Sequence, residues 1–200
     1  MKKEEREELK DIINKNIYIK KCKSNKNKDI NSLSYFYADL NLSQSDNIKV
    51  GNGLEKLLID IVKKNIELKD IKKKNIKGIK ERDNIFMDEK KKKIIYAELK
   101  SNLNLDTEKS KDTVKKCEEI EKEIKKEYPE YEISMNLVGL RYYKKEIIPE
   151  IIKKKYEKIC KNVIGMNEYL KELGVNYIFD DEEEYKEILR YLVKKMYKIN

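Results

Sequence analysis

The chain has 200 residues, of which 42% are charged, and it carries a formal net charge of +9 with no histidine. A chain of this length predicts one domain with room for a real hydrophobic core. The absence of histidine excludes a Ser-His-Asp triad, a Cys-His dyad and His-ligated zinc. Hydrolysis by a metal ion held on carboxylates is compatible with the composition. The positive charge suits a polyanionic partner, although an excess of Lys, Ile and Asn is also typical of an AT-rich genome.

The sequence has no mark of an exported or membrane-bound protein. Its first residues are charged, and no apolar run approaches the length that crosses a bilayer. The three cysteines have a wide and irregular spacing that fits neither a disulfide framework nor a zinc site: Cys22, Cys117 and Cys160. We therefore expect reduced thiols, no contact with a membrane and a cytoplasmic location.

The first part of the chain is expected to form two helices with polar segments between them. Residues 1–22 have an amphipathic pattern that predicts a helix, and residues 23–31 form a polar loop. Residues 42–53 are polar, contain two glycines and lead into a second helix. The apolar positions of this helix repeat at helical spacing: Leu54, Leu57, Leu58, Ile61 and Val62. Glu55 stands beside this stripe, where a favourable interaction with the helix dipole would explain it.

The most informative feature of the chain is a predicted β-hairpin. Two apolar runs, residues 82–87 and 94–100, flank a charged turn. Side chains alternate along a strand, so Glu98 and Lys100 project from the same face. Pairing of the two strands brings Asp83 to the same end of the hairpin, where two carboxylates and one ammonium converge.

This convergence predicts a Mg²⁺ site. Asp83 and Glu98 offer the hard oxygen ligands that Mg²⁺ prefers, and Lys100 can orient or deprotonate a water molecule. Asp88 is the competing ligand, but it falls where the turn begins, and turns recruit Asp for backbone reasons. The plain alternative is that these residues form an ordinary solvated face of a hairpin.

The Glu-Leu-Lys triplet carries little information by itself in so charged a chain. It also occurs at residues 8–10 and 67–69. Both copies lie in stretches with helical spacing, and neither has an Asp on a preceding apolar strand. We therefore expect Lys10 and Lys69 to lie on exposed helix faces.

A helix and a further strand follow the hairpin. The helix extends to about Lys126, with Asp106 as its expected N-cap and Lys109 in its first turn. Residues 133–140 are an apolar run that predicts a strand. A strand, a crossover helix and another strand favour a parallel pairing of the two strands.

The C-terminal part is expected to be a helical scaffold. Helices are predicted for residues 146–161, for residues 167–173, where Gly174 ends the helix, and for residues 181–197. Residues 176–179 form either a short strand or an apolar clip.

The acidic residues and the lysine of the hairpin resemble the motif of the PD-(D/E)xK nuclease superfamily, whose pattern is matched by Asp83, Glu98 and Lys100. The resemblance implies an α/β (α+β) fold with a restriction-endonuclease-like αβββαβ core. In that core a mixed central sheet is flanked by helices, and this chain would add N- and C-terminal helices. The resemblance also implies one endonuclease domain over residues 1–200, with its core at about 50–145 and a helical part at about 146–200.

Within the superfamily, the chain resembles type II restriction endonucleases. In many of them a first core helix, preceded by a glycine-bearing polar loop, adds an acidic residue to the metal site, and Glu55 matches that position. Residues 101–109 also resemble the segment that follows the Glu-x-Lys strand in some of these enzymes. The catalytic residues so implied are Asp83, Glu98, Lys100 and Glu55, with Asp83 and Glu98 as the ligands of Mg²⁺.

Two basic segments are candidates for DNA contact. Lys109 lies in the first turn of the helix that follows the hairpin. Arg141, Tyr143 and Lys144 come just after the predicted strand and combine charge with an aromatic plane.

We therefore expect a type II restriction endonuclease that cuts double-stranded DNA at a short sequence by Mg²⁺-dependent attack of water on the phosphodiester. A symmetric DNA site favours a homodimer, and an enzyme of this kind implies a cognate DNA methyltransferase. Two alternatives stay open. One is a structure-selective or repair nuclease of the same superfamily, such as a junction resolvase; the other is a non-catalytic basic nucleic-acid-binding module.

Overall fold

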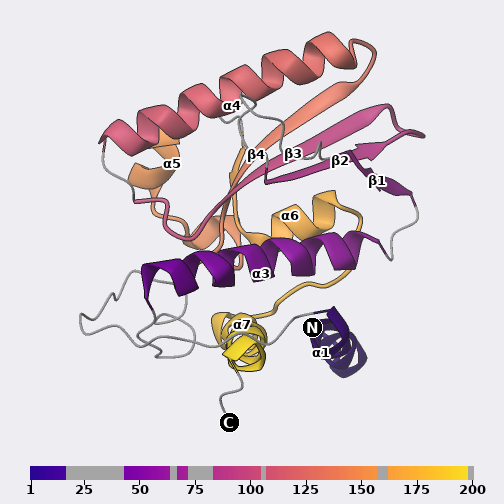
Figure 1. Ribbon diagram of the computed structural model, residues 1–200, viewed down its shortest axis with the longest axis vertical. Helices are drawn as coiled ribbons and strands as arrows, with labels where there is room; N and C mark the ends of the chain where they lie inside the picture. The colour runs from indigo at the N-terminus through magenta and orange to yellow at the C-terminus, as the bar shows by residue number, and fades with distance from the viewer. Residues whose placement is uncertain (17–42, 64–66, 72–82, 105–106, 157–161, 198–200) are drawn as a thin grey trace. The chain divides into compact units, whose positions relative to one another are not determined.

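A computed structural model describes residues 1–16, 43–63, 67–71, 83–104, 107–156 and 162–197 (Figure 1). The chain divides into two compact units. The helical unit comprises Met1–Lys64 and Asn176–Asn200, and the sheet unit comprises Asn65–Val175. The loop predicted at residues 23–31 and the N-cap predicted at Asp106 lie outside the described residues.

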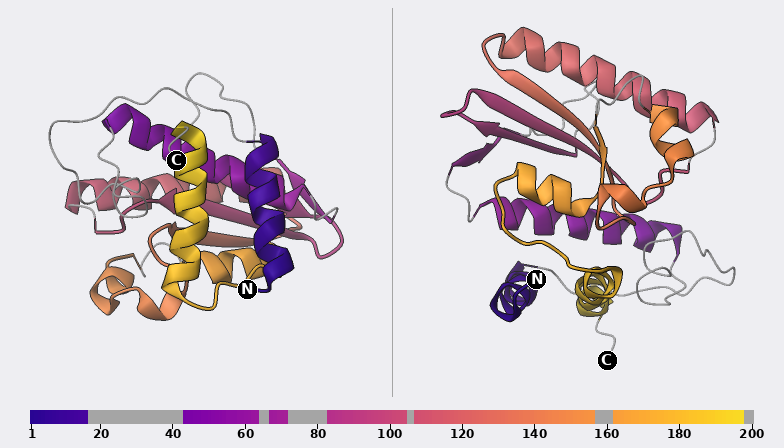
Figure 2. Two further views of the ribbon diagram at one scale, coloured as in Figure 1. Left: turned by 90° about the horizontal axis from the view of Figure 1, so that it is seen from below. Right: turned by 180° about the vertical axis from the view of Figure 1, so that it is seen from behind.

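The helical unit contains α1 (Lys3–Asn16), α3 (Gln44–Val62) and α7 (Glu182–Tyr197), and each of the three helices contacts the other two. Figure 2 shows α1 beside α7. The helices predicted near both ends of the chain are thus confirmed within the described residues. Residues 176–179 form no strand. Phe179 is buried and packs edge-on against Tyr185, which agrees with the alternative of an apolar clip, a segment that packs on the core.

Helix α3 begins ten residues earlier than the sequence predicted, so the expected glycine-bearing loop is wrong. Ser43 caps the helix by accepting a hydrogen bond from the Asp46 backbone N–H. A Cβ atom at Gly53 would lie 2.7 Å from the Met196 sulfur, so this glycine serves close packing of α3 against α7. Glu55 consequently lies in the middle of the helix, and the interaction with the N-terminal dipole does not explain it.

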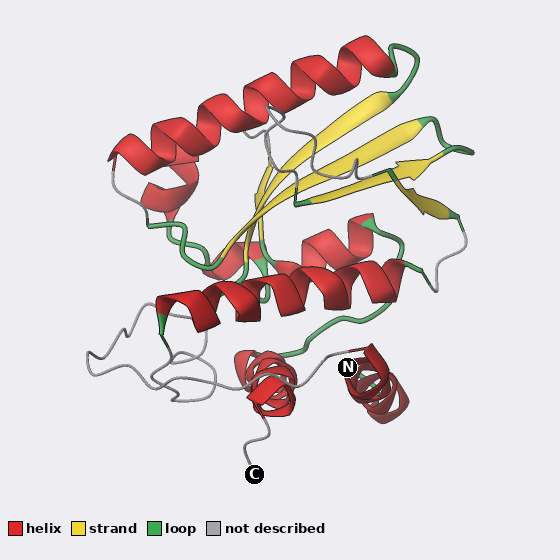
Figure 3. Cartoon of the chain, viewed as in Figure 1, coloured by secondary structure: helices red, strands yellow, loops and turns green. Residues whose placement is uncertain are grey.

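The sheet unit is built on five strands in the order β1-β2-β3-β4-β5 (Figure 3). They are β1 (Leu68–Asp70), β2 (Asn84–Asp88), β3 (Lys93–Lys100), β4 (Glu132–Gly139) and β5 (Asn162–Ile164). The first three strands pair antiparallel, whereas β4 runs parallel to both β3 and β5. The fold is therefore a mixed α+β sheet flanked by helices. The predicted hairpin, the strand at 133–140 and its parallel pairing are confirmed.

Two short strands, β1 and β5, were not predicted. Each has three residues, which is too few to show an alternating pattern. The Glu-Leu-Lys copy at residues 67–69 therefore lies at an edge strand and not on the predicted helix. Lys69 is exposed there and pairs with Glu89. Lys10 lies on α1 as expected, but it is half-buried and pairs with Glu7 and Glu187.

Helix α4 (Thr107–Glu127) covers the sheet face that carries Tyr96, as the two views of the sheet unit show (Figures 1 and 2). Its buried stripe of Cys117, Ile120 and Ile124 packs against Ile85, Tyr96 and Leu137. The free thiol of Cys117 is part of this apolar core.

The remaining helices of the sheet unit are shorter. The helix predicted at 146–161 is a 3₁₀ turn at Lys145–Ile147 followed by α5 (Glu150–Tyr156). The predicted helix ended by Gly174 is α6 (Met166–Glu172), and Gly174 has a φ of 74°, which favours glycine. Helix α6 packs on the other face of the sheet, where Glu172 accepts a hydrogen bond from Asn136 of β4. None of the helices in the described part of the chain is long and apolar enough to cross a membrane.

Packing of α4 on the sheet should dominate the stability of the sheet unit. We expect Ile120→Ala, at a position only 1% exposed, to lower the free energy of unfolding by about 2–5 kcal/mol. The matched control is Ile151→Ala on α5, where the side chain is 79% exposed and the loss should stay within about 0.5 kcal/mol. Urea unfolding of both variants decides the matter, and equal losses would contradict this view of the core.

Candidate active site

The hairpin brings Asp83 and Glu98 face to face. Asn84 pairs with Ala97 in the antiparallel register, so Asp83, one residue earlier, lies opposite Glu98. The Leu99 backbone N–H donates to Asp83 Oδ2 over 2.7 Å, which holds the Asp83 carboxylate against β3. The position predicted for Asp83 from the pairing of the two strands is thus confirmed.

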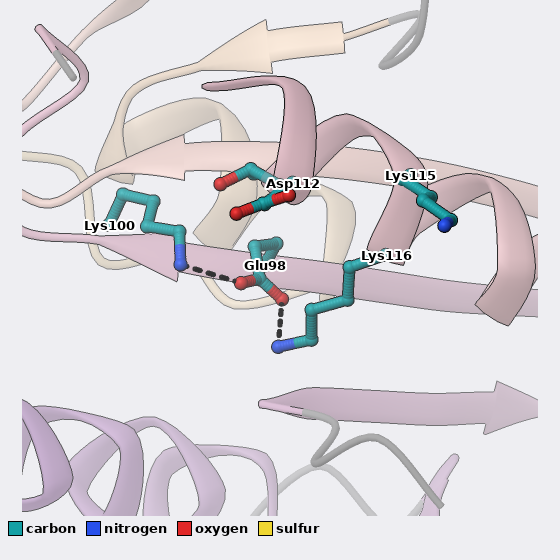
Figure 4. A pocket seen from close by; sticks show the side chains of 6 residues that line it. Glu98, Lys100, Asp112, Lys115 and Lys116 are labelled. Atoms are coloured by element: carbon teal, nitrogen blue, oxygen red, sulfur yellow. Dashed lines mark ion pairs between the residues drawn. The ribbon is translucent and has the colours of Figure 1, made fainter. Parts of the chain in front are cut away.

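Glu98 is fully buried, and its carboxylate has three partners. Lys100 Nζ lies 2.8 Å from Oε1, and Lys116 Nζ lies 2.7 Å from Oε2 (Figure 4). The Tyr96 hydroxyl donates to Oε2 over 2.7 Å. Tyr96, Glu98 and Lys100 therefore share one face of β3, as the alternation predicted. A buried carboxylate needs such compensation, because an unpaired charge in the interior is strongly unfavourable.

Lys116 is the site residue that the sequence analysis missed. It projects from α4, and its Nζ also lies 3.7 Å from Asp83 Oδ1, so its ammonium lies between the two carboxylates. One signal could have found it. Lys116 adjoins Cys117 and stands four residues before Ile120, at the edge of the buried stripe. In a chain with 47 Lys and Arg residues, that position did not stand out.

Burial and the neighbouring charges shift the pKa values of Asp83, Glu98 and Lys116 away from their ordinary values. Burial, and then the Glu98 charge, raise the pKa of Asp83 to about 6. Burial also acts to raise the pKa of Glu98, but the charges of Lys100 and Lys116 outweigh it and hold that pKa below its ordinary value. For Lys116, burial acts to lower the pKa, but Asp83 and Glu98 raise it. The site therefore keeps Glu98 ionised, while Asp83 takes up a proton as the pH falls to about 6.

The Tyr96 hydroxyl keeps its proton. Burial, and then the neighbouring Glu98 charge, raise its pKa well above the ordinary value. The hydroxyl is therefore a fixed hydrogen-bond donor to Glu98 and not an acid that titrates with the site.

A pocket of about 410 Å³ opens beside Glu98. It is lined by Glu98, Lys100, Asp112, Thr113, Lys115 and Lys116. Three of these side chains are ammonium groups, of which Lys115 points away from the Glu98 carboxylate (Figure 4). An anion that entered this pocket would meet positive charge on the α4 side and on the β3 side.

The donor set of the site suits a hard cation. Asp83 and Glu98 offer carboxylate oxygens from two adjacent strands, and a positive charge, the Lys116 ammonium, already lies between them. Among the residues that the structure describes, no group of three or more His, Cys, Asp or Glu side chains is placed to hold a metal ion. A cation here would therefore bind through these two carboxylates, and Mg²⁺ in proteins is commonly held by one or two carboxylates while it keeps several waters.

Asp88, the competing ligand, lies elsewhere. It pairs with Lys93 at the turn end of the hairpin, five residues along β2 from Asp83, which corresponds to roughly 17 Å. Its Oδ1 accepts a hydrogen bond from the Lys91 backbone N–H over 2.9 Å, and this bond keeps the pKa of Asp88 low. Asp88 is therefore a turn residue.

The other predicted site residues are spread over the chain. Glu55 is half-buried on α3 in the helical unit, and its role in a metal site stays a prediction. Lys109 is exposed in the first turn of α4. Arg141 and Lys144 are half-buried just after β4. Tyr143 is only 8% exposed, and Lys144 Nζ lies 5.2 Å from its ring centre, so the ring is not presented for stacking on a base.

Comparison of the chain with protein-family models, with curated proteins and with solved structures found no match. The function is therefore argued from the residues of the site and from the order of the elements that carry them.

The raised pKa of Asp83 makes a prediction about stability. An acid with a raised pKa binds its proton more tightly in the folded state, so the free energy of unfolding falls as the pH rises from about 4 to about 6. Asp83→Asn removes this penalty. We expect the variant to be more stable than the parent by about 1–2 kcal/mol at pH 7.5, with the difference vanishing near pH 4.

Urea unfolding of the parent protein and of Asp83→Asn at both pH values measures this difference. A parent protein that is more stable than the variant at pH 7.5 would show that the charged form of Asp83 is favoured by folding.

Proposed function

We propose that this protein is a Mg²⁺-dependent endodeoxyribonuclease of the type II restriction kind, which cuts double-stranded DNA at a short specific sequence. The observation that carries the proposal is the opposed pair Asp83 and Glu98, with two lysines paired with Glu98 and a pocket lined by three lysines beside it. An ordinary solvated hairpin face would not bury Glu98 completely. A buried charge with a shifted pKa beside a cleft is a candidate for a functional site, and Glu98 has all three properties.

The order of the elements supports the same proposal. Along the chain, α3, β1, β2, β3, α4 and β4 follow one another in the αβββαβ order of a restriction-endonuclease-like core. The positions of the motif residues also support the proposal, because Asp83 lies immediately before β2 and Glu98 and Lys100 lie on the adjacent β3. Agreement between the element order and the positions of three residues is more specific than the triplet alone.

The residues of the site can divide the hydrolytic step between them. Asp83 and Glu98 would hold Mg²⁺, which supplies charge stabilisation at the phosphorus when bound. Lys100 is 30% exposed beside the pocket, so its ammonium can contact a phosphate oxygen and orient the attacking water. Tyr96 holds the Glu98 carboxylate in place by donating a hydrogen bond from its hydroxyl. The lysines that line the pocket would attract the DNA backbone.

The wider assembly follows from the proposed reaction. A symmetric recognition site cut on both strands calls for a homodimer, because two-fold symmetry in the DNA is matched by two-fold symmetry in the protein. A cytoplasmic restriction enzyme would require a cognate DNA methyltransferase to protect the host. Lys109, Arg141 and Lys144 remain candidates for contact with the phosphates.

Digestion of a sequenced plasmid with Mg²⁺, followed by mapping of the ends, tests the proposal. Discrete fragments with a shared end sequence are expected. Cleavage of branched substrates only would favour a junction resolvase of the same superfamily, which would share the catalytic residues. Binding of DNA without any Mg²⁺-dependent cleavage would favour a non-catalytic basic module and would overturn the proposal.

The two proposed metal ligands should be essential for cleavage and dispensable for DNA binding. We expect Asp83→Asn and Glu98→Gln each to lose Mg²⁺-dependent cleavage, while a gel-shift assay shows that binding persists. Asp88→Asn is the matched control, because Asp88 lies on the same hairpin and should leave cleavage intact. If Asp88→Asn were inactive and Asp83→Asn active, Asp88 and not Asp83 would be the metal ligand on this hairpin.

Lys100 should matter far more than the lysines of the other two Glu-Leu-Lys triplets. We expect Lys100→Ala to lose about 3 kcal/mol or more of transition-state stabilisation in single-turnover cleavage, as for the loss of one electrostatic contributor. Lys69→Ala and Lys10→Ala should stay within a few-fold of the parent rate, because they remove only ion pairs with residues outside the site, one at Lys69 and two at Lys10. Equal losses at the three positions would show that the hairpin carries no special chemistry.

A further inference from the structure

Lys116 lies in the proposed active site but has no role in the proposed reaction. Its ammonium is 2.7 Å from Glu98 Oε2 and 3.7 Å from Asp83 Oδ1, which are oxygens that the proposed site would offer to a metal ion. Lys100, by contrast, pairs with the other oxygen of Glu98, Oε1, and faces the pocket. The two lysines therefore have different relations to the same carboxylate.

We propose that Lys116 is a built-in competitor for the metal site: its ammonium neutralises Asp83 and Glu98 in the metal-free protein and is displaced when a divalent cation binds. The inference rests on the proposed function, because it takes these two carboxylates as the metal ligands. It adds that Lys116 sets how tightly the metal is held.

Electrostatics requires this competition. Two cations about 4 Å apart repel each other by about 4 kcal/mol per pair of unit charges at the effective dielectric constant of a protein surface, and by more for a divalent ion. The Glu98 carboxylate is fully buried, so solvent screens little of this repulsion. A metal ion on Asp83 Oδ1 and Glu98 Oε2 therefore competes with the Lys116 ammonium for these oxygens, whereas Lys100 lies on the other oxygen of Glu98.

The displaced ammonium has a place to go. Lys116 itself lines the pocket of about 410 Å³, together with Thr113 and Lys115 of the same helix. A lysine side chain has several rotatable bonds, so the ammonium can turn into this pocket while α4 stays in place. Lys116 then remains charged and hydrated, and no helix needs to move.

The chain offers a matched control at the next position. Lys115 lies on the same helix, lines the same pocket and carries the same charge, but it points away from Glu98 (Figure 4). Lys115→Met and Lys116→Met thus remove the same charge from the same region. Only Lys116→Met removes the ammonium that lies between the two carboxylates.

Binding of terbium measures the metal site without any reaction. The chain has 14 tyrosines and no tryptophan, and Tyr96 donates a hydrogen bond to Glu98, so tyrosine can sensitise the luminescence of Tb³⁺ bound there. Titration of the DNA-free protein with Tb³⁺ should show affinity raised at least about fivefold in Lys116→Met and changed less than about twofold in Lys115→Met, on the scale of one partly buried ion pair. Lys116→Gln, which keeps a polar side chain, should behave like Lys116→Met and serves if the methionine variant fails to fold.

The outcomes separate this inference from the proposed function. Terbium affinity that is unchanged or weaker in both Lys116 variants, or equally raised in Lys115→Met, would overturn the role of Lys116. If in that case Glu98→Gln still abolishes the luminescence, the metal site itself stands. Luminescence that does not depend on Glu98 in any variant would remove the metal site and the inference together.

Discussion

The site depends on one fully buried carboxylate, that of Glu98. Burial of an ion from water costs on the order of several kcal/mol even after the protein has relaxed around it. Here the cost is offset by two ammonium groups and one hydroxyl, from Lys100, Lys116 and Tyr96. These partners come from β3 and from α4, so the charge on Glu98 is stable only when the helix lies on the sheet.

This requirement joins the chemistry of the site to the core of the sheet unit. Lys116 is adjacent to Cys117, whose side chain packs in the apolar layer between α4 and the strands. Two successive residues of α4 therefore have different roles, since Lys116 belongs to the site and Cys117 belongs to the core. Asp83 is held in place by a hydrogen bond from the Leu99 backbone N–H, which joins Asp83 to β3 at the end of the hairpin away from the turn. A carboxylate pair built in this way is preorganised, because packing and hydrogen bonds hold both members before any ligand arrives.

The residues of the hairpin could be placed from the sequence because a strand has a strict period of two. That period put Glu98 and Lys100 on one face, and the charged turn fixed the pairing that brought Asp83 opposite Glu98. The helix over 107–127 and the strand after it were visible for a similar reason, since both are long enough to show a pattern.

The features that could not be predicted depend on tertiary contacts. Lys116 belongs to the site only because α4 crosses the sheet above Glu98, and no local pattern distinguishes it from its many neighbouring lysines. Strands β1 and β5 exist because neighbouring strands pair with them, and three residues are too short to show this alone. Glycine at position 53 suggested a loop, whereas it allows α3 to approach Met196 closely. Local sequence therefore determined the longer elements, and packing determined the short strands and the contact of Lys116 with Glu98.

The most direct test of this account is the position of the metal ion itself. Crystals soaked in Mn²⁺, which replaces Mg²⁺ and scatters anomalously, would reveal the ion as a peak in an anomalous difference map. The account predicts a peak in contact with both the Asp83 and the Glu98 carboxylates, with the Lys116 ammonium moved away from them. A peak at other carboxylates, with Lys116 still between Asp83 and Glu98, would contradict it.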